Sequence, residues 1–132
     1  MPDSIRIVST PEACKPGGHY SQALVHHGTV YVSGLLPIDP QTGEKKLGAI
    51  EEQVEVALCN LAAILKSADS DLDHVLKVTV YISDIELWPK VNAAYARIFG
   101  AHKPARAVVP TRDLHFGFKV EIEAIAAVKG SR

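Results

Sequence analysis

Between residues 50 and 83 the spacing of apolar residues changes from the period of a helix to that of a strand. This change constrains the fold more than any other feature. Spacings of three and four residues predict a helix over 50–68 with one apolar stripe, and strict alternation predicts a strand over 75–83. The stripe comprises Ile50, Val54, Ala57, Leu58, Leu61, Ile64, Leu65 and Ala68. The predicted strand has Leu76, Val78, Val80 and Ile82 on its buried face and Lys77, Thr79, Tyr81 and Ser83 on the other.

Other segments complete the pattern. Residues 23–26 and 29–33 flank His27-Gly28 and predict a β-hairpin. A second helix is expected to begin at Pro89 and end at Gly100. Short strands are expected around 106–109 and 118–128. The order ββ-α-β-α-ββ predicts an α+β fold in which a mixed β-sheet carries both helices on one face, within a single domain spanning residues 1–132.

Composition narrows the class of protein. Fourteen Lys and Arg against fifteen Asp and Glu leave a net charge of −1, which argues against binding phosphate backbones by bulk charge. No apolar run approaches the roughly 18 residues that a membrane span requires, and Asp3 stands where a signal peptide would carry bases. We therefore expect a cytoplasmic protein that binds neither nucleic acid nor membrane. Cys14 and Cys59 are expected to be free thiols, and the six histidines suggest no metal site.

The predicted last strand has an unusual second face. Its apolar face comprises Val120, Ile122, Ala124 and Ala126, whereas Lys119, Glu121, Glu123, Ile125 and Ala127 point the other way. Together with Leu35, Thr79 and Tyr81, this second face is too polar for a monomer core and too apolar for a plain solvent face. It predicts packing between subunits, with the polar groups lining clefts.

Two side chains are candidates for chemistry. Arg106 interrupts a small apolar segment, either as a peripheral arginine whose head reaches water or as a guanidinium fork that binds a carboxylate through two hydrogen bonds. Glu121 is a solvated strand residue, a member of a structural ion pair, or a functional carboxyl. The pattern of residues alone leaves both choices open.

The order of motifs resembles the RidA family of enamine/imine deaminases, the YjgF-like proteins also described as L-PSP endoribonucleases or translation inhibitors. The resemblance covers nearly the whole chain. The matching segments are Tyr20-Ser21-Gln22-Ala23, Val32-Ser33-Gly34, Asp39-Pro40-x-Thr42-Gly43-Glu44, Val91-Asn92-x-x-Tyr95 with Phe99, Pro104-Ala105-Arg106, and Val120-Glu121-Ile122-Glu123-Ala124-Ile125-Ala126.

The resemblance implies a homotrimer of chorismate-mutase-like (bacillar) fold, with three clefts between subunits and no cofactor or metal. It implies that Arg106 grips the carboxylate of a small 2-enamino or 2-imino acid of the 2-aminoacrylate type. Glu121 would activate the water that releases ammonia and leaves a 2-keto acid. The remaining implied substrate-binding positions, some from the neighbouring subunit, are Tyr20, Ser33, Gly34, Asn92 and the backbone of Val108.

Three departures from the family pattern leave the substrate range open: His19 in place of Pro, Leu35 in place of Gln, and Val108 in place of Cys. The segment His115-Phe116-Gly117-Phe118 can also reshape the cleft. Chemistry that needs a thiol at position 108 is excluded. The rival functions are an endoribonuclease, a non-catalytic ligand sensor or chaperone-like trimer, and a deaminase for a larger, aminomuconate-like acid.

Overall fold

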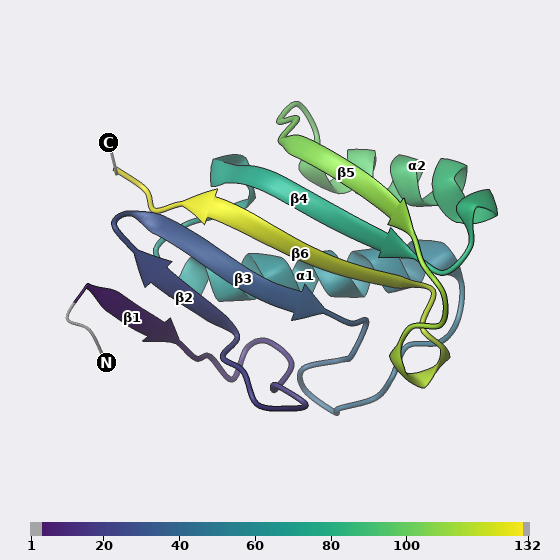
Figure 1. The fold of residues 1–132 in the computed structure, drawn as a ribbon, viewed down its shortest axis with the longest axis horizontal. Helices are drawn as coiled ribbons and strands as arrows, with labels where there is room; N and C mark the ends of the chain where they lie inside the picture. The colour runs from purple at the N-terminus through teal and green to yellow at the C-terminus, as the bar shows by residue number, and fades with distance from the viewer. Residues whose placement is uncertain (1–3, 131–132) are drawn as a thin grey trace.

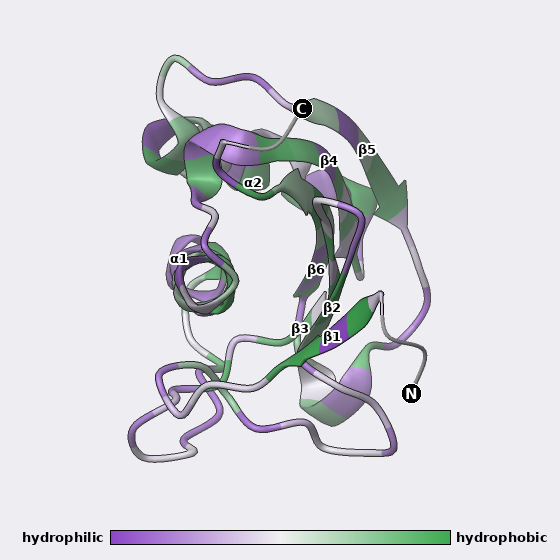
Figure 2. Ribbon diagram, turned by 90° about the vertical axis from the view of Figure 1, so that its left-hand side faces the viewer, coloured by the Kyte–Doolittle hydropathy of each residue, from purple (hydrophilic) through white to green (hydrophobic). Residues whose placement is uncertain are grey.

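A computed structural model describes residues 4–130. Residues 1–3, which include the Asp3 weighed against a signal peptide, and residues 131–132 lie outside the described part. One six-stranded mixed sheet has the strand order β1-β2-β3-β6-β4-β5, and both helices cover the same face of it (Figures 1 and 2). Strands β4 and β5 pair in parallel, and their connection contains α2. The elements are β1 (Ile5–Val8), β2 (Ala23–His26), β3 (Thr29–Leu35), α1 (Ile50–Ser67), η1 (Leu72–His74), β4 (Val75–Ile82), η2 (Ile85–Leu87), α2 (Trp88–Phe99), β5 (Ala105–Pro110), η3 (His115–Gly117) and β6 (Val120–Ala127).

The predicted α+β class, the mixed sheet and both helices are confirmed, with boundaries within about two residues for most elements. Strand β1 was not predicted. It has only four residues, of which only Val8 is buried, while Ile7 is 51% exposed. A segment this short shows no alternation that distinguishes it from a loop, and its pairing with β2 defines it as a strand.

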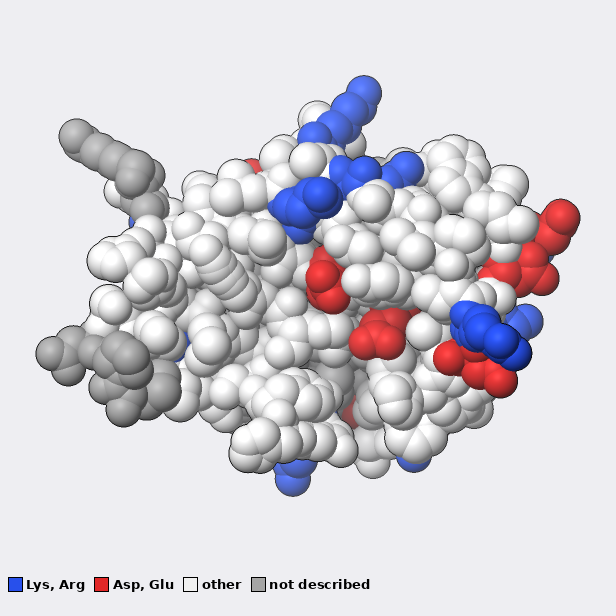
Figure 3. Space-filling view, in the orientation of Figure 1, with Lys and Arg blue, Asp and Glu red and all other residues white. Residues whose placement is uncertain are grey.

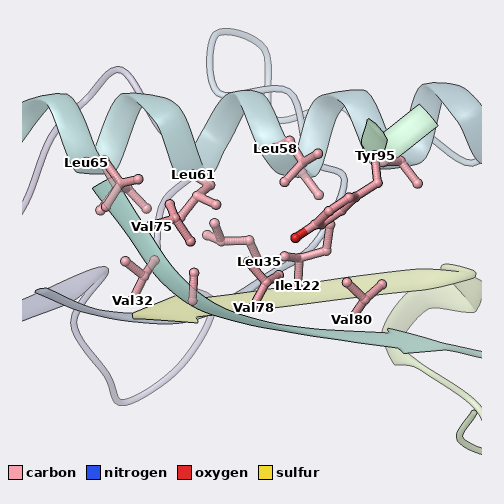
Figure 4. Packing of buried hydrophobic residues seen from close by; sticks show 14 of the residues in the cluster. Val32, Leu35, Leu58, Leu61, Leu65, Val75, Val78, Val80, Tyr95 and Ile122 are labelled. Carbon is pink, nitrogen blue, oxygen red and sulfur yellow. The ribbon is translucent and has the colours of Figure 1, made fainter. Parts of the chain in front are cut away.

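The core lies between the apolar stripe of α1 and the helix-facing side of the sheet. Leu58, Leu61 and Leu65 are fully buried against β-strand residues such as Val78 and Ile122 (Figure 4). Burial of this kind stabilises by about 25 cal/mol for each Å² of apolar surface removed from water. The alternating face Val120, Ile122, Ala124 and Ala126 also belongs to this core, as predicted.

Two buried polar side chains on α1 hold loops rather than interrupt the core. Asn60 accepts a hydrogen bond from the Cys14 backbone N–H (2.8 Å) and donates one to the Ile38 carbonyl (2.9 Å). Gln53 accepts from the Lys119 N–H at 2.9 Å, just before β6. Because a buried amide without partners destabilises a fold, these bonds fix the loops firmly to the helix.

Two predictions about side-chain direction were wrong, and each error lies at a register shift. Leu76 is 52% exposed and Val75 is buried instead, because pairing with β6 shifts between Val75 and Lys77. Leu35 is 4% exposed and pairs with Ile122 in the core, because a similar shift follows Val32 in β3. An extra residue in one strand reverses the alternation beyond it.

The face of the sheet opposite the helices carries the predicted mixture of side chains. The strand registers align four partly exposed apolar residues in one row across it, namely Ile7, Leu24, Tyr31 and Ile125. Glu123 pairs with Thr79, and Glu121 with Tyr81, further along the same face. This face is largely uncharged, with acidic side chains near its centre (Figure 3). Within residues 4–130, no helix is long and apolar enough to cross a membrane.

Candidate functional site

A cavity of about 490 Å³ opens beside the C-terminal end of β3. Three separate segments form its walls: the loop before β2, the end of β3 with the loop that follows, and the η3 turn together with the start of β6. Its lining residues are Cys14, Lys15, Pro16, Gly17, Gly18, Tyr20, Gln22, Ser33, Gly34, Leu35, Leu36, Ile38, Lys45, His115, Phe116 and Glu121. Sequence reasoning predicted Tyr20, Ser33, Gly34 and Glu121, and the fold brings these four together.

Glu121 lies directly against Gly34. A Cβ atom added at Gly34 would overlap the Glu121 Oε2 atom, so the absence of a side chain at position 34 leaves room for the carboxyl. Ser33, next to it, donates a hydrogen bond from its Oγ to the Ser21 carbonyl at 2.6 Å. The Ser33 hydroxyl therefore holds the wall of the cavity in this structure.

The surroundings of Glu121 raise the pKa of its carboxyl. Burial is the largest cause, the charge of Glu123 adds to it, and His115 opposes it. A carboxyl whose pKa lies nearer neutrality than usual holds and releases a proton more evenly near physiological pH. The cavity thus contains a group suited to moving protons to and from a bound water.

Gln22 shapes the loop that forms one wall. Its side-chain amide donates to the carbonyls of Thr10 and Cys14 at 3.0 Å each and accepts from the Thr10 N–H at 2.7 Å. The Tyr20 hydroxyl accepts from the Gly17 N–H at 3.1 Å, while 51% of the Tyr20 residue remains exposed. Of the residues in this loop, sequence reasoning named only Tyr20 as part of the site, although Gln22 stands within the same matched motif.

Arg106 lies in a different place, at the edge strand β5. Its Nη1 donates to Asn92 Oδ1 at 2.9 Å, and its guanidinium carbon lies 4.8 Å from the centroid of the Tyr95 ring. Both partners belong to α2, so the helix holds the guanidinium by a hydrogen bond and by cation–π attraction. Several of the Arg106 donors remain available for a ligand.

Arg106 and Glu121 lie on opposite faces of the sheet. Arg106 pairs with Val78, whose side chain is buried on the helix side, and Val108 packs against the core on the same side. Glu121 alternates with the buried Ile122 and therefore faces away from the helices. The candidate residues of one chain therefore form two separate groups: those lining the cavity around Glu121, and Asn92, Arg106 and Val108 on the helix side of the sheet.

Comparisons with known proteins agree with this architecture. The family model described as endoribonuclease L-PSP matches residues 10–128. The 2-iminobutanoate/2-iminopropanoate deaminase of Capra hircus is 42% identical over 121 residues, which are 92% of this chain and 88% of the goat protein. RidA from the Antarctic bacterium Psychrobacter superposes with a TM-score of 0.89 at 34% identity, covering 93% of this chain and 99% of that one. E. coli TdcF, solved with bound serine, has a TM-score of 0.88 at 33% identity, covering 92% and 98%.

The mixed sheet, the helices on one face and the cavity with its carboxyl define an α+β protein whose cavity has the size of small-molecule sites. More particularly, the chain belongs to the L-PSP family, and the resemblance to the RidA (YjgF-like) proteins is confirmed.

Proposed function

We propose that this protein hydrolyses small 2-imino acids and their 2-enamino tautomers to 2-keto acids and ammonia, in clefts between the subunits of a homotrimer. The shared cleft is proposed because Arg106 and Glu121 lie on opposite faces of one sheet. Two residues so placed can meet at one substrate only if they come from different chains. The activity itself is supported by curated relatives about 40% identical that are named 2-iminobutanoate/2-iminopropanoate deaminase.

In the proposed reaction, Arg106 binds the substrate carboxylate through two parallel hydrogen bonds, with Asn92 orienting the guanidinium. Fixing the carboxylate converts an encounter into a positioned complex. Tyr20, Ser33 and Gly34 line the cleft, and the backbone at Val108 completes the guanidinium side. No cofactor or metal takes part in this scheme.

Glu121 performs the proton transfers. The imine nitrogen first takes up a proton from solvent. Glu121 takes a proton from water as the water oxygen bonds to the carbon of this protonated imine, which gives a neutral tetrahedral carbinolamine. Glu121 then returns that proton to the amino nitrogen, the C–N bond breaks, and ammonia leaves. The hydroxyl group loses its proton to solvent, which replaces the proton taken up at the start, so the sum is imino acid plus water giving keto acid plus ammonia. The raised pKa of Glu121 suits a group that acts first as base and then as acid.

The row Ile7, Leu24, Tyr31 and Ile125 supports the trimer. These residues expose between 38% and 51% of their surface on a largely uncharged sheet face. Packing this face against neighbouring copies would remove apolar area from water and bring a second chain beside the cavity. A head-to-tail arrangement that closes after three copies gives three equivalent clefts.

The test uses two inactive variants in one assembly. Arg106→Ala and Glu121→Gln chains, carrying different tags, are produced separately and together. If each cleft takes Arg106 from one chain and Glu121 from its neighbour, a random equimolar mixture recovers about a quarter of wild-type activity. Ammonia release from imino acids generated in situ is the readout, with each pure variant as control.

If both residues of a cleft came from one chain, every cleft in the mixture would lack one of them and no activity would return. That result would overturn the shared cleft. A wild-type protein that cleaves RNA but releases no ammonia would overturn the deaminase and favour the endoribonuclease. Binding of 2-oxobutyrate without turnover would favour the ligand sensor.

A further inference from the structure

Within a single chain the cavity has a volume of about 490 Å³ and extends from Glu121 and Gly34 to the η3 turn. A neighbouring chain in the proposed trimer would close the cavity but leave this internal wall in place. Glu121 and Ser33 are among its few polar groups near Gly34. Much of the remaining wall is apolar or aromatic, formed by Pro16, Leu36, Ile38 and Phe116. This wall is suited to contact an apolar substrate side chain beyond the reacting carbon.

Phe116 is the least expected residue of this wall. It has φ 60° and ψ 14°, the left-handed region that side chains other than glycine seldom adopt, and 59% of its surface is exposed. A residue held in such a conformation costs about 1–3 kcal/mol, which the surrounding structure must offset. Among the non-glycine residues with positive φ in the described part of the chain, Phe116 is the one that lines the cavity, and strain beside a cavity is consistent with a role in ligand binding.

The Phe116 ring is held from two sides. The Phe116 ring lies edge-on to the buried ring of Phe118, with 6.1 Å between the two centroids. The Lys45 ammonium lies 4.6 Å from the centroid of the Phe116 ring. An edge-on aromatic pair and a cation–π contact each favour one ring position. The ring is therefore a preorganised part of the cavity wall.

We propose that Phe116 is a specificity-determining residue that selects imino acids with large apolar side chains, branched or aromatic, over the three-carbon acid. This inference rests on the proposed deaminase function and assigns the side-chain pocket of the same site. One methylene more or less in an apolar pocket changes kcat/KM by roughly 10- to 200-fold, so the loss of a whole ring should be readily measured.

The experiment compares kcat/KM for imino acids generated in situ by an amino-acid oxidase from leucine, phenylalanine, alanine and glutamate. Phe116→Ala should lower the leucine-to-alanine and phenylalanine-to-alanine ratios on the order of tenfold. Phe116→Gly should lower them equally, although glycine removes the backbone strain, because both variants lack the ring. Phe116→Leu should retain most of the preference. Ile85→Ala, at a 56% exposed residue outside the cavity, is the matched control and should leave the ratios unchanged.

The outcomes separate the two proposals. Wild-type protein that hydrolyses none of the imines would overturn the deaminase function itself. Active protein whose ratios do not change in Phe116→Ala and Phe116→Gly would overturn this inference alone. Wild-type preference for the glutamate-derived dicarboxylate would also overturn it, and would assign the pocket to the ammonium groups of Lys15 and Lys45 instead.

Discussion

At the scale of single residues, Glu121 connects activity with pH. Its carboxyl must be ionised to accept a proton from water, and its pKa is raised mainly by burial. We therefore expect kcat/KM to fall on the acid side at a pH above 4.5, the ordinary value for glutamate. Glu121→Gln should abolish most turnover and remove this acid limb. The measurement is kcat/KM as a function of pH for wild type and Glu121→Gln. If the variant kept the same fall in kcat/KM at acid pH, the titrating group would be another residue.

The same shift predicts an effect on stability. A carboxyl whose pKa is higher in the folded than in the unfolded chain binds more protons when folded, so its contribution to stability falls as pH rises through that interval. At pH 7, Glu121 therefore lowers the free energy of unfolding. Glu121→Gln should be more stable than wild type at pH 7, and the difference should shrink below pH 4.5. Urea unfolding of both proteins at pH 7 and below pH 4.5 measures this difference in the free energy of unfolding.

The buried hydroxyl of Tyr95 is a second group expected to lower the stability of the folded protein. It has no hydrogen-bond partner among the described residues, and it points toward Leu35 and Ile122 (Figure 4). Burial raises the pKa of this hydroxyl to about 12. Because an unsatisfied buried hydroxyl costs about 1–3 kcal/mol, Tyr95→Phe should stabilise the protein by about 1 kcal/mol. The ring under Arg106 is retained, so turnover should persist. A less stable Phe variant would indicate that the hydroxyl has a partner in the assembly.

At the scale of elements, the irregular end of β3 decides what lies against the Glu121 carboxyl. The register shift between Val32 and Leu35 brings Gly34 against Glu121 and sends Leu35 into the core. Gly34→Ala should displace the Glu121 carboxyl, because the added methyl overlaps it. We expect a loss of kcat/KM of tenfold or more, on the scale of a displaced catalytic group, with little change in the melting temperature. Gly48→Ala is the matched control, since Gly48 lies outside the cavity and a Cβ added there meets only the exposed Glu52 side chain, at 3.1 Å.

At the scale of the whole molecule, the apolar row across the open sheet face predicts assembly. Wild-type protein should sediment as a trimer at micromolar concentration. Ile125→Asp places a charge in the row and should give monomers that are folded but inactive, because each cleft would lose one of its two groups of residues. Ile85→Asp, at a similarly exposed residue in η2, should remain trimeric. A fully active monomer would contradict both the assembly and the shared cleft.

The sequence by itself determined the periodic parts of this protein. The stripe of α1 and the alternation in β6 follow from side-chain geometry that each segment repeats, and the order of motifs marked Arg106 and Glu121. Only the tertiary structure decided which face each residue occupies after a register shift, as at Leu35 and Leu76. It also decided that Arg106 contacts α2 while Glu121 faces away from the helices. The physical reason is that strand register, loop closure and the choice of neighbouring strands depend on contacts between distant segments. The local pattern of apolar residues within one segment does not specify those contacts.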